Sequence, residues 1–193
     1  MQTVFNKMNW CNANLFFLNF DKCFSISFSK HPNHVKFNYI LENGTTCIRV
    51  NSIKDPGVIF DSKLTFKENI TYVVGRANQS FISRSTKSFK NPDVIKYLYL
   101  TLTKSILMYA SAIWRPNMRG EINRIERVQH KVLRKLALLT DNPTLRFNHD
   151  CTLAAESFYL AVNSCMTASV CIFVYKIMSY QVKCTELADI FLV

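Results

Sequence analysis

The spacing of apolar residues changes near residue 67, and this change constrains the fold more than any other feature of the sequence. Upstream of it, apolar and polar residues alternate over residues 23–29, which is the period of a half-buried strand. Downstream, apolar residues recur every three or four positions, as on amphipathic helices. We therefore predict an α+β chain, with a small β-hairpin and strand piece over residues 1–67 and a mainly α-helical bundle over residues 68–193.

Turn residues divide the first part into short elements. A helix is expected over residues 1–15 and a strand over 23–29, followed by a hairpin over 35–50. The hairpin is predicted because Asn43-Gly44 is a favoured pair for a tight turn between strands. Another short strand is expected over residues 58–60, between a Pro56-Gly57 turn and a turn that begins at Asp61.

Capping signals divide the second part into helices. Asn91 followed by Pro92 is typical of a helix N-terminus, and Pro116 is expected to end the helix that follows. Residues 141–143 (Asp-Asn-Pro) end the next helix in the same way. The predicted helices cover residues 66–87, 94–114, 121–139, 152–182 and 185–192.

The positive charge of the chain is concentrated in one block. The 193 residues include 24 Lys and Arg against 13 Asp and Glu, a formal net charge of +11. Residues 76–135 hold 13 of the basic and 3 of the acidic side chains, whereas residues 136–193 hold 3 and 5. A cationic excess confined to a patch favours binding to a polyanion such as nucleic acid.

The predicted helix over residues 121–139 carries the clearest part of this patch. At 100° per residue, five basic side chains fall within an arc of about 100°, and the apolar side chains fall on the opposite face. We call these five residues the basic stripe: Arg124, Arg127, Lys131, Arg134 and Lys135. A stripe of this kind can follow a phosphate backbone, so nucleic-acid contact is predicted. An ordinary solvated helix face is the simpler interpretation of the same pattern.

Two other classes of partner remain open from the residues alone. The basic block would also suit an acidic protein partner. Residues 157–175 are nineteen consecutive uncharged residues, close to the length of a membrane-spanning helix. Polar side chains at positions 163, 164, 167 and 169 interrupt this run, so a buried helix of a bundle explains it equally well. A membrane-associated helical protein stays an alternative, but no membrane partner is expected.

The cysteines and histidines predict neither a disulfide framework nor a metal site. The seven cysteines include no Cys-x-x-Cys pair, which is typical of reduced thiols in an intracellular chain, cytoplasmic or nuclear and not secreted. His31 and His34 have no thiol at zinc-finger spacing. Asp55 and Asp61 could form a catalytic carboxylate pair, but both positions favour the interpretation of turn aspartates.

Several segments form a set that is specific through its order, although each alone is a weak signal. Two of them are Ile53-Lys-Asp-Pro-Gly-Val-Ile-Phe-Asp-Ser-Lys-Leu-Thr-Phe66 and Arg124-Ile-Glu-Arg-Val-Gln-x-Lys-x-Leu-Arg134. In order along the chain, they resemble segments of the reverse transcriptases of jockey-like non-LTR retrotransposons. The segments Leu18-Asn-x-x-Lys22-Cys23 and Ser105-Ile-Leu-x-Tyr-Ala-Ser-x-Ile-Trp-x-Pro116 resemble the same family's motif D and thumb. The resemblance covers essentially the whole chain.

This resemblance implies a fragment of an RNA-directed DNA polymerase: the end of the palm, the primer grip and the thumb. In that family, the catalytic aspartates are one residue early in the palm and the two aspartates of a Tyr-Ala-Asp-Asp motif. This sequence contains no Asp-Asp pair. No catalytic residue and no cofactor are therefore expected in this chain; Mg²⁺ is expected only in the intact enzyme. The implied partners are an RNA template, a DNA primer and a separate portion that carries the palm and fingers.

The resemblance also implies roles for single residues. The primer-grip-like turn comprises Asp55, Pro56, Gly57 and Val58, and Pro56 stands where the family has leucine. Lys22 matches the motif D lysine, which would donate a proton to the departing pyrophosphate in an intact enzyme. Because the metal ligands are expected elsewhere, the chain alone should not extend a primer.

Overall fold

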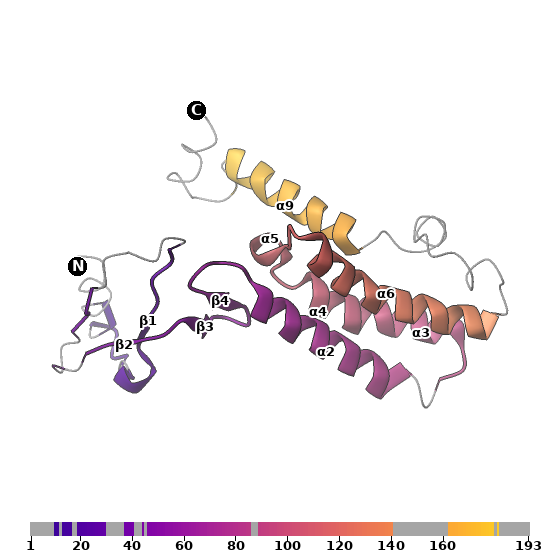
Figure 1. Cartoon of the computed structure of the whole chain (residues 1–193), viewed down its shortest axis with the longest axis horizontal. Coiled ribbons are helices and arrows are strands. Elements are labelled where there is room, and N and C mark those ends of the chain that lie inside the picture. The colour runs from indigo at the N-terminus through magenta and orange to yellow at the C-terminus, as the bar shows by residue number, and fades with distance from the viewer. Residues whose placement is uncertain are drawn as a thin grey trace. The chain divides into compact units, whose positions relative to one another are not determined.

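The computed structural model describes residues 10–11, 13–16, 19–29, 37–40, 44, 46–85, 89–140, 162–179 and 181. The chain divides into two compact units, Met1–Thr65 and Phe66–Val193. Short strands belong to the first unit, and the second is helical (Figure 1). A few short strands followed by mainly helical chain is the order that the apolar spacing predicts.

The first strand pair of the amino-terminal unit differs from the prediction. After a 3-10 turn η1 (Phe20–Lys22), strand β1 (Phe24–Ser25) pairs in parallel with β2 (Ile48–Arg49). The predicted strand over residues 23–29 is therefore too long, since only two of its residues pair with β2. The backbone N–H of Val50 donates to the carbonyl of Ser25 (2.9 Å), which continues the parallel pairing beyond β2.

The predicted hairpin over residues 35–50 is confirmed only next to its turn. Ile40 and Thr46 form an antiparallel bridge, and the N–H of Cys47 donates to the carbonyl of Tyr39 (2.7 Å). Gly44 between them has a φ of +76°, which glycine adopts without strain. Beyond Cys47 the predicted hairpin does not continue, because Ile48 and Arg49 of β2 pair with β1 instead. Of the helix predicted over residues 1–15, residues 1–9 lie outside the described chain, and residues 10, 11 and 13 are helical.

A second hairpin contains the turn at Asp55. Strand β3 (Ser52–Lys54) pairs with β4 (Ile59–Asp61) in antiparallel register, Lys54 opposite Ile59. The predicted strand over residues 58–60 is thus present one residue later, with a partner strand that the alternation did not reveal. The N–H of Asp55 donates to the carbonyl of Val58 (2.9 Å). Pro56 and Gly57, whose φ is +86°, fill the two central positions, as type II turns prefer.

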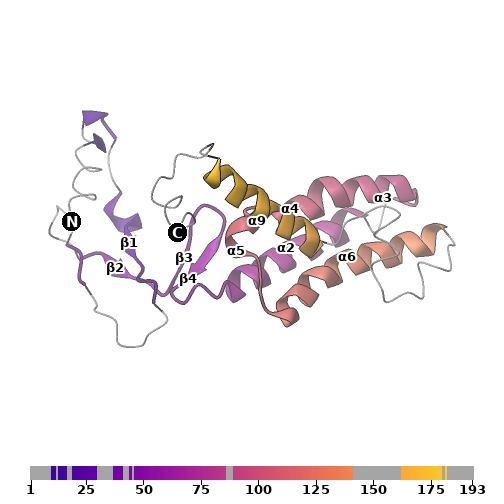
Figure 2. The same ribbon diagram turned by 90° about the horizontal axis from the view of Figure 1, so that it is seen from above.

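The helical unit contains α2 (Lys67–Ser85), α3 (Pro92–Leu98), a π-helical segment η2 (Tyr99–Thr103), α4 (Lys104–Met108), α5 (Ser111–Trp114), α6 (Arg119–Thr140) and α9 (Val162–Met178). The predicted cap is confirmed, because the Asn91 side chain accepts the N–H of Asp93 (2.9 Å) and Pro92 is in the first turn. Figure 2 shows the same helices from above. The helix predicted over 152–182 ends earlier than expected, because α9 stops at Met178 and the described residues Ser179 and Gln181 are not helical. The helix predicted over 185–192 lies outside the described residues.

The single helix predicted over residues 94–114 is wrong, since the chain turns at Tyr109 and Ala110. Ala110 adopts a left-handed φ of +50°, which no α-helix tolerates. The indole N–H of Trp114 donates to the carbonyl of Tyr109 (2.8 Å), and this bond spans the turn. Trp114 is 1% exposed, so burial of a large side chain fixes the direction of α5. The helix ends before Pro116 as expected.

The apolar face of α6 lies in the core, as its periodicity predicts. Val132 and Leu136 pack in a buried cluster with Phe81 of α2, Ile95 of α3 and Tyr99 of η2. Val128 and Ile125 are also buried, about one and two turns before Val132. This packing fixes the rotation of α6, so its basic stripe must face away from the core.

Helix α9 begins against two side chains of α6. The backbone N–H of Val162 donates to Gln129 Oε1 (3.2 Å), and that of Asn163 donates to Glu126 Oε1 (2.8 Å). The first N–H groups of a helix have no partner within it, and a carboxylate there also interacts favourably with the helix dipole. Gln129 and Glu126 therefore cap α9 from another helix.

Replacing Gln129 by alanine is expected to destabilise the protein by about 1–3 kcal/mol, because the Val162 N–H loses its acceptor in a buried site. Gln129 is 2% exposed, so water does not readily replace its oxygen. The free energy of unfolding in urea, followed by circular dichroism, measures the loss. Gln79→Ala, an exposed change on α2, is the control and should alter stability by less than about 0.5 kcal/mol. Equal values for the two variants would contradict the capping role.

Candidate nucleic-acid interface

Helices α2 and α6 lie side by side and run in the same direction (Figure 1). Arg124 donates to the Thr71 hydroxyl (3.0 Å), and Lys131 donates to Asn78 Oδ1 (2.8 Å). The residues of both pairs are 53 positions apart in sequence, and the second pair is two helical turns beyond the first. Part of the basic stripe thus borders the seam between the helices.

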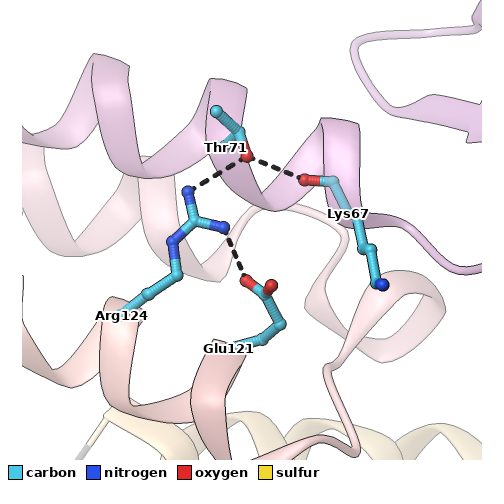
Figure 3. A network of polar contacts seen from close by, with 4 residues as sticks. All are labelled: Lys67, Thr71, Glu121 and Arg124. Carbon is cyan, nitrogen blue, oxygen red and sulfur yellow. Dashed lines mark hydrogen bonds and ion pairs between the residues drawn. The ribbon is translucent and has the colours of Figure 1, made fainter.

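A small polar network holds Arg124 in place (Figure 3). Its guanidinium forms a salt bridge with Glu121 Oε2 at 2.8 Å as well as the bond to Thr71. The Thr71 hydroxyl in turn donates to the backbone carbonyl of Lys67 (3.0 Å). Because Glu121 offsets its charge and two bonds fix its position, Arg124 mainly joins α6 to α2 and has less charge to offer a ligand.

Arg127 and Arg134 are the most available members of the stripe. Both are exposed, and neither forms a hydrogen bond or ion pair with another residue that the structure describes. On a helix they lie about one and about three turns beyond Arg124, rotated away from α2. An arginine in this setting presents its full charge and its fork of N–H donors to solvent, which suits a phosphate group.

The two lysines of the stripe differ from each other. Lys131 is exposed, and its ammonium has three donors, so the bond to Asn78 leaves two of them for a ligand. Lys135 is half-buried beside the core face of α6. The exposed cations Arg127, Lys131 and Arg134 thus form a row that spans about 10 Å of helix axis.

Helix α2 leaves the adjacent surface open. Gly75 lies between Thr71 and Asn78 on the same helix face, and no atom lies within 4 Å of the point where its Cβ would be. Arg76, also exposed, lies over the Tyr72 ring, with its guanidinium carbon 5.8 Å from the ring centroid. The seam beside the row of exposed cations is therefore not covered by a side chain at position 75.

The turn that resembles a primer grip is a well-formed surface hairpin. Asp55, Pro56 and Gly57 are exposed, whereas Val58 is buried at 3% exposure. Proline at position 56 suits this turn, because a type II turn favours it at the second position. The turn belongs to the first compact unit, whereas the basic stripe belongs to the second.

The carboxylate of Asp61 has a local structural role. Its Oδ2 accepts the backbone N–H of Thr65 (3.0 Å) and the Thr65 hydroxyl (3.1 Å), which confirms the interpretation of a turn aspartate. Over the described part of the chain, no three His, Cys, Asp or Glu side chains lie together as metal ligands would. His31 and His34 lie outside the described residues, and Lys22 is exposed at the end of η1.

Comparison with known proteins identifies no relative. No family model, no curated protein and no solved structure matches the chain. In the described ranges, none of the helices combines the length and the apolar composition that crossing a bilayer requires.

The structural roles of three residues in and near the site could not be predicted from the sequence. Thr71 and Asn78 read as ordinary helix residues, and only the packing of α2 on α6 brings them to Arg124 and Lys131. Glu126 reads as a charge that offsets the stripe, yet it caps α9. These hydrogen bonds join residues tens of positions apart, and the periodicity of a single segment cannot predict them.

Proposed function

We propose that the chain binds nucleic acid through the row of exposed cations on α6, as the thumb-containing portion of a retrotransposon RNA-directed DNA polymerase. The observation that carries the proposal is the exposure of Arg127 and Arg134, two arginines with no partner among the described residues, on a helix whose opposite face is buried. Contact between these cations and the phosphates of a nucleic acid would release the counterions of the phosphates, so binding would weaken steeply as salt rises.

The resemblance narrows the ligand to an RNA template paired with a DNA primer. In that family the thumb and primer grip hold the growing end of the primer, so the preferred ligand is a recessed primer–template end. Lys22 and the turn at 55–58 would act only together with a palm and fingers portion that supplies the metal-binding aspartates. Mg²⁺ would be bound by that portion, and the chain by itself would hold the duplex without extending it.

Fluorescence anisotropy with a labelled RNA–DNA hybrid tests the proposal. The full chain is expected to bind a recessed primer–template end more tightly than a blunt hybrid of the same length, with an affinity that falls as salt rises. Absence of binding at low ionic strength would overturn the nucleic-acid function. Primer extension by the chain alone would contradict the assigned division of roles.

The same measurement tests the alternative of an acidic protein partner. An acidic protein is recognised through its charge, so a basic face built for it would bind any polyanion. Equal affinity for the recessed end, the blunt hybrid and heparin would therefore favour that alternative and count against the polymerase relationship.

A further inference from the structure

Two cysteines stand next to each other across the parallel strand pair of the first unit. Cys23 directly precedes β1 and Cys47 directly precedes β2, and the register pairs Phe24 with Ile48. Because the strands are parallel, the residues before this pair are themselves neighbours. Adjacent strands lie about 4.8 Å apart, which is within the range of Cα separations that a disulfide spans.

A direct contact shows how close the two residues are. The Cys47 thiol donates to the backbone carbonyl of Cys23, with its sulfur 3.3 Å from that oxygen. The Cys23 thiol donates to the carbonyl of Asn19 (3.4 Å). Neither cysteine forms a disulfide in the structure, and both residues are half-buried, so a small reagent can reach them. Rotation about the Cα–Cβ bonds is the change that would bring the two sulfurs together.

The other described cysteines offer no comparable pair. Cys165 and Cys171 both belong to α9, and six residues on a helix place them about 120° apart around its axis. Cys11 lies in the amino-terminal helical turn, away from the register of β1 and β2 in sequence. Among the residues that the structure describes, strand register therefore selects Cys23 and Cys47.

We propose that Cys23 and Cys47 are a redox pair that closes into a disulfide between β1 and β2, an activity independent of the proposed nucleic-acid function. The oxidant would be a low-molecular-weight disulfide such as oxidised glutathione. One cysteine thiolate attacks a glutathione sulfur and releases the first glutathione thiolate; the second cysteine then attacks the mixed disulfide and releases the other. The two cysteine thiols are oxidised, one glutathione disulfide is reduced to two thiols, and these take up the two protons that the cysteines lose.

The bond would strengthen a very short strand pair. Strands β1 and β2 have two residues each, and a sheet this short is marginal without further support. A link between positions 24 apart in sequence restricts the unfolded chain. Closing the pair would thus raise the urea concentration at which the first unit unfolds, and reduction would lower it again.

Peptide mapping of the full chain tests the pair without any variant. After incubation with oxidised glutathione, the remaining thiols are blocked with N-ethylmaleimide, and the protein is digested and analysed by mass spectrometry. We expect a linked peptide that joins Cys23 to Cys47, which disappears after reduction. Blocked thiols at both positions, or either cysteine linked elsewhere, would overturn the proposal.

Substitutions provide an independent readout. Cys23→Ser and Cys47→Ser should each stop the reaction at the mixed disulfide, so the remaining cysteine keeps one glutathione. Cys171→Ser, an exposed change in the other unit, is the matched control and should leave the linked peptide at its original yield. Loss of that bound glutathione from the remaining cysteine in either single variant would contradict a role for the missing partner.

Discussion

Replacing Arg127 and Arg134 together by glutamine is expected to lower the affinity for an RNA–DNA hybrid about 100-fold at 50 mM salt. Each lost phosphate contact removes about 0.9 from the slope of log affinity against log salt, so two contacts remove about 1.8 and contribute about tenfold each at that salt concentration. These two arginines are chosen because they are exposed and have no partner among the described residues. Fluorescence anisotropy over a range of salt concentrations measures affinity and slope together.

The control variant removes the same charge from elsewhere. Lys63→Gln with Lys176→Gln also lowers the net charge by two, and both lysines are exposed and outside the stripe. If binding depends on the row of α6, this variant should keep most of its affinity and nearly all of its salt slope. Equal losses in the two variants would show that only net charge matters and would remove the assigned interface.

Lys131 and Arg124 are poorer choices for this experiment. Lys131 donates to Asn78, and Arg124 bonds to both Thr71 and Glu121, so replacing either one also loosens the contact between α6 and α2. A loss of affinity in those variants would combine lost charge with lost structure. Arg127 and Arg134 separate the two effects.

Replacing Trp114 by alanine is expected to destabilise the protein by about 3–5 kcal/mol, the usual cost of removing a large buried aromatic side chain. Trp114 is 1% exposed, and its indole N–H also donates to the Tyr109 carbonyl at the turn into α5. The free energy of unfolding in guanidinium chloride, followed by circular dichroism, measures the change. Ile113→Ala, at a 54% exposed neighbour, should cost less than about 1 kcal/mol.

Trp114→Phe separates burial from hydrogen bonding. Phenylalanine keeps an aromatic ring in the core but cannot donate to the Tyr109 carbonyl, so we expect an intermediate loss of about 1–3 kcal/mol. A phenylalanine variant as stable as the original would show that the indole N–H does not hold the turn at Ala110. An alanine variant within about 1 kcal/mol of the original would contradict the packing of α5 itself.

The sequence determined the features that depend on residues a few positions apart. The apolar period located α2 and α6 to within two residues at each end, and it placed Val132 and Leu136 on the core face of α6. Asn91 with Pro92 located the start of α3, and Pro116 located the end of α5. These signals are local because a helix turn, a cap and a proline stop each involve only neighbouring backbone groups.

Only the tertiary structure decided which segments pair. Alternation in residues 23–29 indicates a strand, but it cannot show that β1 takes β2 as a parallel partner and thereby aligns two cysteines. The turn at Ala110 depends on the burial of Trp114. Likewise, helical periodicity placed five cations on one face, and the packing of α2 then occupied Arg124 and left Arg127 and Arg134 open. Each of these outcomes is set by contacts between distant residues, whose free energy exceeds the local preference of any one segment.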